Sequence, residues 1–399
     1  MSNFTRTSPQ SASVNASEAG LRPYRINVPQ AGLDDLRARL ARTRWAPGLP
    51  GTGWERGVPA GYLRELAAYW ADGYDWRARE ARLNEFPQFT TPISVDGCEP
   101  LDIHFLHVRS PHDDAVPLVR THGWPGSVAE FEDVIGPLTD PTAYGGDAAD
   151  AFHVVCPSLP GYGFSGKPTE PGWGVARIAA AWSELMTRLG YDRYGAQGGD
   201  WGAMVTTLIG SRHPEHCLGI HLNMAVVLPP AADDLTEAEQ RSVDSLQHHR
   251  RWGSGYSKQQ STRPQTLGYG LADSPAAQCA WIIEKFHEWT DNDGSPEDAV
   301  DRDRLLDNVL LYWLPNSGAS SARLYWESLR SSPFEIPQVP VGCSIFPHEI
   351  FRPSRRWAEG HFGDRLVRFN ELDRGGHFAA FEEPDLFVDE VRATFRAMR

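Results

Sequence analysis

The chain has 399 residues, of which 41% are hydrophobic and 23% are charged. This composition is typical of a globular protein with about two or three segments of domain size, and it excludes disordered and fibrous proteins. The formal net charge of −14 argues against a basic stripe that could hold a phosphate backbone. Nucleic acid is therefore not an expected partner.

The N-terminal residues and the cysteines indicate the cellular compartment of the protein. Residues 1–21 are rich in Ser, Asn, Thr and Ala and are predicted to be a disordered tail, because they contain no apolar run of the length that a signal peptide or membrane anchor requires. The five cysteines are scattered, without the Cys/Cys or Cys/His spacing of a zinc site. We expect a cytoplasmic protein with no membrane partner and no metal.

Residues 22–110 are predicted to form an N-terminal unit that contains helices. The stretch GLDDLRARLARTRW repeats leucine at helical spacing. The stretch GYLRELAAYW places two leucines and a tryptophan on one helical face before Gly73 ends it. Such apolar stripes indicate packing against a core, not a functional site.

The pattern of the chain changes after residue 110. In residues 111–227, short apolar runs such as VPLVRTHG and AFHVVCPS alternate with helix-like segments such as VARIAAAWSELMTRLG. This alternation predicts an α/β fold with a mostly parallel sheet covered by helices. Residues 228–335 are helical, loop-rich and dense in Trp and Tyr, and strand pattern resumes in 336–399 with VPVGCSIF. We interpret 228–335 as a helical cap inserted into the sheet domain.

The stretch AQGGDWGAMV carries the strongest chemical signal. Gly198, Asp200 and Gly202 fit the pattern G-x-nucleophile-x-G between a strand-like and a helix-like segment, where the nucleophile sits on a sharp turn with small neighbours. An ordinary Asp at a helix N-cap is the alternative. A carboxylate that attacks a carbonyl forms a poor anhydride intermediate, whereas attack on a saturated carbon leaves an alkyl ester that water can cleave. Asp200 therefore predicts displacement at a saturated carbon.

Ester cleavage requires a general base and a group that orients it. His377 in GGHFAAFEEP follows the nucleophile in the chain order nucleophile, acid, histidine of alpha/beta-hydrolases. Glu349 follows the strand-like VPVGCSIF and is predicted to orient the imidazole. Asp373 is the alternative orienting residue, and a structural role is the alternative for His377.

Two further stretches contain candidate loops. HGWPGS follows an apolar run, and in alpha/beta-hydrolases such a loop donates a backbone N–H to the oxyanion hole. We predict that Trp124, and Trp201 after the nucleophile, supply these two N–H groups. A Pro-Gly turn with a buried Trp is the alternative for HGWPG. GYGFSG matches the G-x-G-x-x-G pattern of dinucleotide-binding loops. In those proteins a helix follows the glycines and binds the phosphates, but here Pro168 and Gly172 interrupt that segment. A dinucleotide site is therefore not expected.

HGWPGS, SLPGYGFSG, GGDWG, FPHE and GGHFAAFEEP occur in this order, after RPYRINVP and YDWRAREARLNEFPQF. Together they resemble the microsomal-type epoxide hydrolases over residues 22–399. The resemblance implies an alpha/beta-hydrolase core, a helical cap and no cofactor. It also implies two cap tyrosines that hydrogen-bond the epoxide oxygen, at Tyr256 and Tyr325. The membrane anchor of the animal members is missing.

The sequence thus predicts an enzyme that hydrolyses a bulky or aromatic epoxide to a vicinal diol through an ester on Asp200. The expected partners are the epoxide and water, and a homodimer and a place in secondary metabolism are further hypotheses. Haloalkane dehalogenase is one alternative, because it shares the Asp and His but needs halide-binding N–H donors in place of phenols. A non-catalytic ligand-binding module on the same fold is the other.

Overall fold

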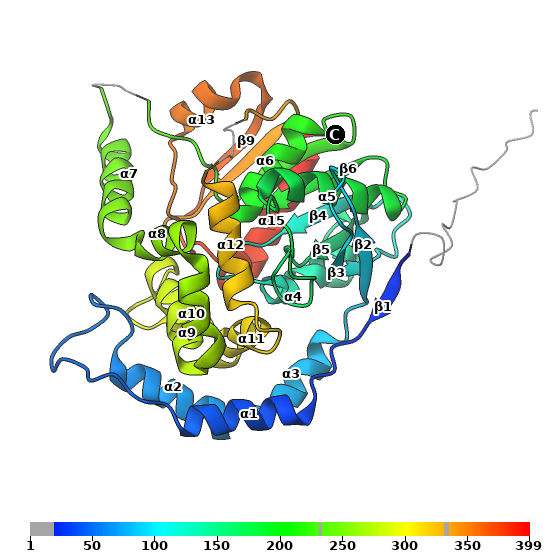
Figure 1. The fold of residues 1–399 in the computed structure, drawn as a ribbon. Coiled ribbons are helices and arrows are strands. Elements are labelled where there is room, and N and C mark those ends of the chain that lie inside the picture. The colour runs from blue at the N-terminus through cyan, green and yellow to red at the C-terminus, as the bar shows by residue number, and fades with distance from the viewer. Residues whose placement is uncertain (1–19, 231–233, 331–334) are drawn as a thin grey trace, which may run out of the picture.

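The computed structural model describes residues 20–230, 234–330 and 335–399, so the predicted tail lies, except for its last two residues, outside the described residues. The centre of the fold is a nine-stranded sheet of order β1-β2-β3-β5-β4-β6-β7-β8-β9 (Figure 1). The strands are β1 (Arg22–Tyr24), β2 (Gln88–Ile93), β3 (Leu101–Val108), β4 (Val116–Thr121), β5 (Phe152–Pro157), β6 (Tyr194–Gly198), β7 (Cys217–Leu222), β8 (Val341–Ile345) and β9 (Leu366–Glu371).

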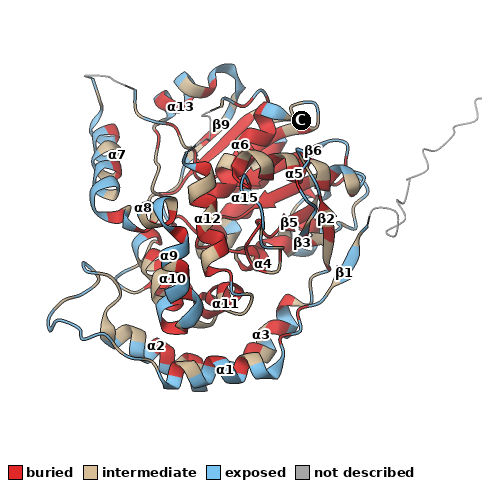
Figure 2. Ribbon diagram, viewed as in Figure 1, coloured by how far each residue is buried: buried red, intermediate tan, exposed pale blue. Residues whose placement is uncertain are grey.

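The sheet is mostly parallel, as predicted. The strands from β5 to β9 in the sheet order run parallel, whereas β1, β2 and β3 are antiparallel to their neighbours. All residues of β6 and β8 are buried (Figure 2), which requires helices on both faces of the sheet. The covering helices are α4 (Glu132–Thr139), α5 (Val175–Arg188), α6 (Asp200–Arg212), α13 (Arg355–Phe362), α14 (Ala379–Glu382) and α15 (Pro384–Arg396).

The chain between β7 and β8 is helical, as expected of an inserted cap. Its helices lie together beside the sheet (Figure 1), and α12 packs against α8 and α9. They are α7 (Glu237–His248), α8 (Gly255–Thr262), α9 (Pro264–Asp273), α10 (Pro275–Trp289), α11 (Arg302–Trp313) and α12 (Gly318–Ser328). The boundaries of the predicted regions at 22–110, 111–227, 228–335 and 336–399 stay predictions.

The N-terminal helices α1 (Gln30–Ala41), α2 (Ala60–Asp72) and α3 (Trp76–Leu83) form an arc along the cap (Figure 1). The three leucines of α1 are buried, and Gly73 caps α2, as the leucine pattern predicts. Tyr69 and Tyr74 donate hydrogen bonds of 2.6 Å to Asp303 and Asp307 of α11. The extension is therefore bonded directly to the cap.

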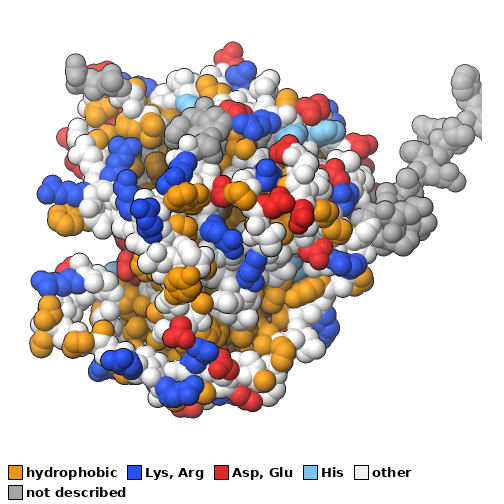
Figure 3. Space-filling model, viewed as in Figure 1, with side chains coloured by type: hydrophobic (Ala, Val, Ile, Leu, Met, Phe, Trp, Pro, Cys, Tyr) orange, Lys and Arg blue, Asp and Glu red, His pale blue; other side chains and the backbone are white. Residues whose placement is uncertain are grey.

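The surface carries both signs of charge on the face that Figure 3 shows. No helix among the described residues is long and apolar enough to cross a bilayer. The five cysteines are all buried and free.

Candidate active site

Asp200 lies where β6 ends and α6 begins, at a turn whose backbone is strained. Its φ of 49° is in the left-handed region, which a non-glycine residue adopts only at a cost. The turn also leaves no space for a side chain at two neighbouring glycines. A Cβ on Gly202 would lie 1.9 Å from the carbonyl oxygen of Thr121, and one on Gly123 would lie 2.1 Å from Asp200 Oδ1. The predicted elbow therefore has the backbone geometry that its glycines suggest.

His377 lies in the loop between β9 and α14 and reaches Asp200 from the other end of the chain. Its Nε2 is 3.4 Å from Asp200 Oδ2, and its Nδ1 is 2.7 Å from Glu349 Oε1. Both His377 and Glu349 are buried. Asp373, the alternative orienting residue, points away: its side chain is 85% exposed and contacts Arg374. The structure thus brings Asp200, His377 and Glu349 together.

The two carboxylates determine the charge of His377. Burial alone would lower the pKa of His377, but Glu349 and Asp200 together outweigh burial and hold this pKa well above its usual value. The two negative charges therefore favour the protonated imidazole. Among the residues that the structure describes, no cluster of three or more His, Cys, Asp or Glu could hold a metal ion.

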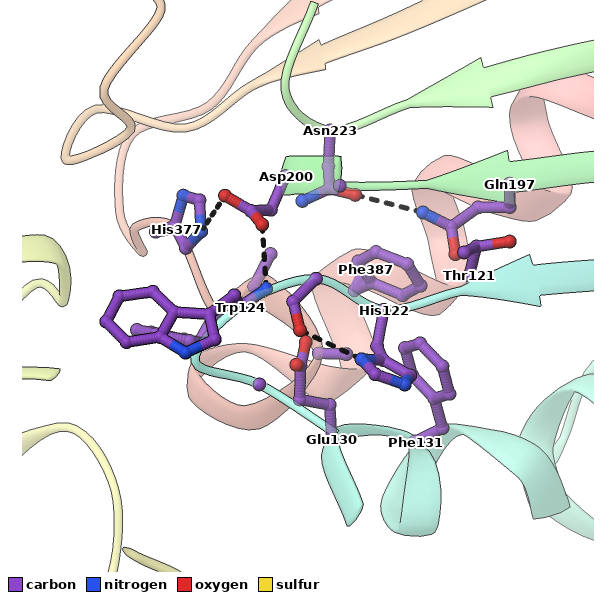
Figure 4. A pocket seen from close by; sticks show the side chains of 16 residues that line it. Thr121, His122, Trp124, Glu130, Phe131, Gln197, Asp200, Asn223, His377 and Phe387 are labelled. Atoms are coloured by element: carbon purple, nitrogen blue, oxygen red, sulfur yellow. Dashed lines mark hydrogen bonds and ion pairs between the residues drawn. The ribbon is translucent and has the colours of Figure 1, made fainter. Parts of the chain in front are cut away.

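The loop after β4 supplies the first predicted oxyanion donor. The backbone N–H of Trp124 donates a 2.8 Å hydrogen bond to Asp200 Oδ1 (Figure 4). Trp201 is the second residue of α6, so its N–H belongs to the helix N-terminus, where unpaired N–H groups and the helix dipole favour negative charge.

Two residues that sequence reasoning missed hold this loop from the cap. Asn308 Nδ2 donates to the carbonyl oxygen of Pro125, and Tyr312 Oη donates to that of Gly126, both at 2.7 Å. Both side chains come from α11 and are buried. No sequence signal separates them from ordinary polar residues of an amphipathic helix.

The two predicted tyrosines meet above Asp200 although they come from different cap helices. Tyr256 in α8 and Tyr325 in α12 have ring centroids 5.8 Å apart. Tyr256 stacks on Trp124 at 5.0 Å, and Tyr325 packs edge-on against Trp201 at 4.7 Å. Burial, with a contribution from the charge of Asp200, raises the pKa of both phenols well above 10. Both tyrosines are therefore protonated and able to donate.

Two cavities border Asp200. The cavity on the cap side has a volume of about 200 Å³ and contains both tyrosines. Its apolar lining is provided by Trp201, Met204, Met224, Val226, Ile350 and Phe351. The cavity on the core side has a volume of about 20 Å³, enough for one water molecule (Figure 4). Asp200 is the residue that lines both.

Glu130 lines the smaller cavity with Asp200 and His377, and sequence reasoning missed it. Its Oε1 accepts a 3.1 Å hydrogen bond from the backbone N–H of Ser127. Burial, against the opposing effect of the His377 cation, raises the pKa of Glu130 to about 8. The spacing S-x-x-E could have predicted a capping box at this helix start, but not that Glu130 lines the same cavity as Asp200.

Comparison with known proteins agrees with this geometry. Residues 21–131 match the family "Epoxide hydrolase N terminus", and residues 116–252 match "alpha/beta hydrolase fold". A putative epoxide hydrolase of Stigmatella aurantiaca is 54% identical, over 95% of this chain and 86% of the relative. Epoxide hydrolase 1 of Sus scrofa is 34% identical, over 96% and 90%.

A solved structure extends the similarity to the whole fold. The structure of Aspergillus niger epoxide hydrolase superposes with a TM-score of 0.86 at 33% identity and covers 98% of each chain. Sequence and structure therefore favour the epoxide hydrolase prediction over the dehalogenase and the ligand-binding module. The chain belongs to the microsomal-type epoxide hydrolase family and is an epoxide hydrolase with the alpha/beta-hydrolase fold.

Proposed function

We propose that the enzyme opens its epoxide through a covalent ester on Asp200. The observation that carries this proposal is the position of the Asp200 carboxylate. It projects from a strained backbone turn, accepts a hydrogen bond from Trp124 N–H, and lines the cavity that contains the tyrosines. In ring opening, an Asp200 oxygen forms a bond to an epoxide carbon while the C–O bond of the ring breaks. The released oxygen takes a proton from Tyr256 or Tyr325, because a phenol is an acid strong enough to protonate an alkoxide.

Formation of the ester on Asp200 also lowers the pKa of the proposed base, His377. The ester on Asp200 carries no charge, so one of the two carboxylates that raise the pKa of His377 is lost. The pKa of the imidazole then falls, and its proton can pass to the phenolate left by ring opening. Neutral His377 next removes a proton from water as that water attacks the ester carbonyl of Asp200. The N–H groups of Trp124 and Trp201 hold the resulting oxyanion.

The smaller cavity gives the water a place of its own. It is lined by Asp200, His377 and Glu130 and lies apart from the cavity that holds the tyrosines. We assign the hydrolytic water to this cavity and the epoxide to the larger one. The two reactants would then approach Asp200 without competing for the same space.

The larger cavity supports a neutral epoxide with an aromatic or bulky substituent. Its lining is mostly apolar and aromatic, and His249, which also lines it, has a pKa lowered to about 4 by burial and by Lys285. Among the described residues that line this cavity, Asp200 is the one carboxylate, and none is a lysine or arginine. The cytoplasmic location, a homodimer and a place in secondary metabolism remain predictions.

One turnover in heavy-oxygen water tests the covalent route. With enzyme in excess, the first diol should carry an unlabelled oxygen from Asp200, while the peptide that contains Asp200 gains label when the ester is cleaved at its carbonyl. Mass spectrometry measures both products. A first diol fully labelled from solvent, together with unlabelled Asp200, would show that the carboxylate only activates water.

A further inference from the structure

Helix α10 carries a buried ammonium group next to the proposed proton donors. The side chain of Lys285 is only 3% exposed. Its Nζ lies 2.6 Å from Glu284 Oε1 and 2.6 Å from Glu288 Oε2, and these two glutamates are 37% and 33% exposed. Burying an ammonium group is costly unless it is paired. The cation therefore lies inside the cap, while the carboxylates that compensate it lie nearer to solvent.

The buried cation faces the aromatic side chains of the site. Lys285 Nζ is 5.0 Å from the ring centroid of Tyr256 and 5.5 Å from that of Trp289. Trp289 in turn packs against His377 at 4.9 Å, and its carbonyl oxygen accepts the backbone N–H of His377. Cations at such distances are attracted to the face of an aromatic ring. Lys285 is thus close to one proposed proton donor, Tyr256, and is separated from His377 by Trp289.

The two tyrosines differ in this respect. Tyr325 packs against Trp124 and Trp201, and in the part of the chain that the structure describes no cation lies over its ring. Tyr256 has the ammonium of Lys285 nearby, but also three negative charges that oppose loss of its proton: Asp200, Glu288 and Glu349. A hydrogen bond with Tyr325 favours that loss. A phenol beside negative charges is a weak acid unless a cation offsets them.

We propose that Lys285 is an electrostatic positioning residue for Tyr256 and makes Tyr256 the main proton donor in ring opening. This role rests on the proposed function. As the epoxide C–O bond breaks, the phenol O–H bond of Tyr256 breaks and its proton moves to the substrate oxygen. The electron pair of the O–H bond stays on Tyr256 as a phenolate. The ammonium of Lys285 attracts this phenolate more strongly than the neutral phenol, so it stabilises the transition state.

A double-mutant cycle tests the coupling. The rate of ester formation on Asp200 is measured by rapid quench with enzyme in excess, in Lys285→Met, Tyr256→Phe and the double variant. Lys285→Met should slow ring opening about 10-fold when Tyr256 is present, from a cation–ring interaction of the strength found at desolvated sites. In the Tyr256→Phe background the same change should have less than about a 2-fold effect, because no phenolate forms there. The rate of ester hydrolysis should be unchanged.

Glu288→Gln is the matched control, because it removes the Lys285–Glu288 ion pair by neutralising the carboxylate and keeps the ammonium group. Glu284 still holds the ammonium in this variant, and a negative charge facing Tyr256 is lost, so ring opening should be as fast as in the natural enzyme or faster. Lys285→Arg keeps the charge and should retain most of the rate. Circular dichroism compares the folds, and Lys285→Gln replaces Lys285→Met if the latter does not fold.

The outcomes separate this inference from the proposed function. If Lys285→Met slows ring opening equally with and without the Tyr256 hydroxyl, or if Glu288→Gln slows it as much, Lys285 is a structural residue of the cap and the inference is wrong. If Tyr256→Phe itself leaves ring opening unchanged, the assignment of Tyr256 as a proton donor fails, and the role of Lys285 fails with it.

Discussion

At the scale of single residues, the strained backbone of Asp200 positions its carboxylate between two cavities. A non-glycine residue at a φ of 49° costs about 1–3 kcal/mol, which the surrounding contacts must outweigh. Gly202 allows α6 to pack closely against Thr121, and Gly123 leaves space for the carboxylate. The result is a side chain that projects from the end of β6 between two cavities.

His377→Gln should separate the two half-reactions. Because His377 is proposed to act only on the ester, the variant should still be alkylated, and the peptide that contains Asp200 should gain the mass of the substrate. Turnover should fall about 10²- to 10⁴-fold, the usual contribution of a general base. Mass spectrometry after rapid quench measures the adduct, and Asp200→Asn serves as the control that cannot form it readily. An inactive His377→Gln variant without adduct would assign His377 to ring opening as well.

At the scale of elements, α11 connects three parts of the molecule. Near its start, Asp303 and Asp307 accept hydrogen bonds from tyrosines of the N-terminal extension. Further along, Asn308 and Tyr312 donate hydrogen bonds to the carbonyl oxygens of Pro125 and Gly126, in the loop that contains the proposed oxyanion donor Trp124. The cap therefore helps to position an N–H donor that belongs to the core.

Two matched tyrosine variants test this function of α11. Tyr312→Phe removes the hydrogen bond to the carbonyl oxygen of Gly126, next to the loop residue Trp124, and Tyr69→Phe removes one from the extension to the same helix. Each should cost about 1 kcal/mol of unfolding free energy, the net value of one hydrogen bond. Only Tyr312→Phe should slow both half-reactions, by several-fold, because Trp124 N–H holds the carboxylate before and during the reaction. Equal kinetics in the two variants would contradict a positioning role for α11.

Much of the site could be predicted because its signals are local. The glycines around Asp200 and the loop at Trp124 have short sequence patterns, since backbone turns restrict the residues within a few positions of them. The chain order then indicated His377 and Glu349. The residues that were missed depend on tertiary packing. Lys285 has a glutamate on either side in EKFHEW, a pattern typical of a solvated helix face, and only the packing of α10 under Tyr256 buries it.

At the scale of the whole molecule, burial keeps several histidines neutral. His104, His122 and His221 are at most 2% exposed, and burial lowers their pKa to about 3, about 4 and about 4. His122 also accepts the backbone N–H of Leu159 through Nε2, a bond that protonation of this nitrogen would break. The unfolded chain, with ordinary histidines, binds these three protons at a pH near 6.5.

These histidines predict that the protein loses stability in mild acid. Between pH 6.5 and 4.5 unfolding takes up three protons on them, so the free energy of unfolding falls as the pH falls. Glu130 and Glu382 act in the opposite direction: burial raises the pKa of each to about 8, so the native state holds two protons that the unfolded chain releases above pH 4.5. Burial also lowers the pKa of His107 and His249 to about 4. Five histidines therefore take up protons on unfolding while two glutamates release them, so the free energy of unfolding falls as the pH falls.

Urea unfolding at pH 6.5 and pH 5.0 measures this balance. The free energy of unfolding should be lower at pH 5.0, because the histidines take up more protons on unfolding than the two glutamates release. Glu130→Gln removes one of the two opposing carboxyl groups, so the loss should be about 2 kcal/mol larger in this variant. The Glu130→Gln variant also tests the protonation of Glu130 in the active site. Only a carboxyl group that is protonated in the folded protein can make the loss of unfolding free energy larger when it is replaced by Gln. Equal or greater stability at pH 5.0 would mean that the buried histidines take up protons without unfolding, and would contradict their neutral state in the native fold.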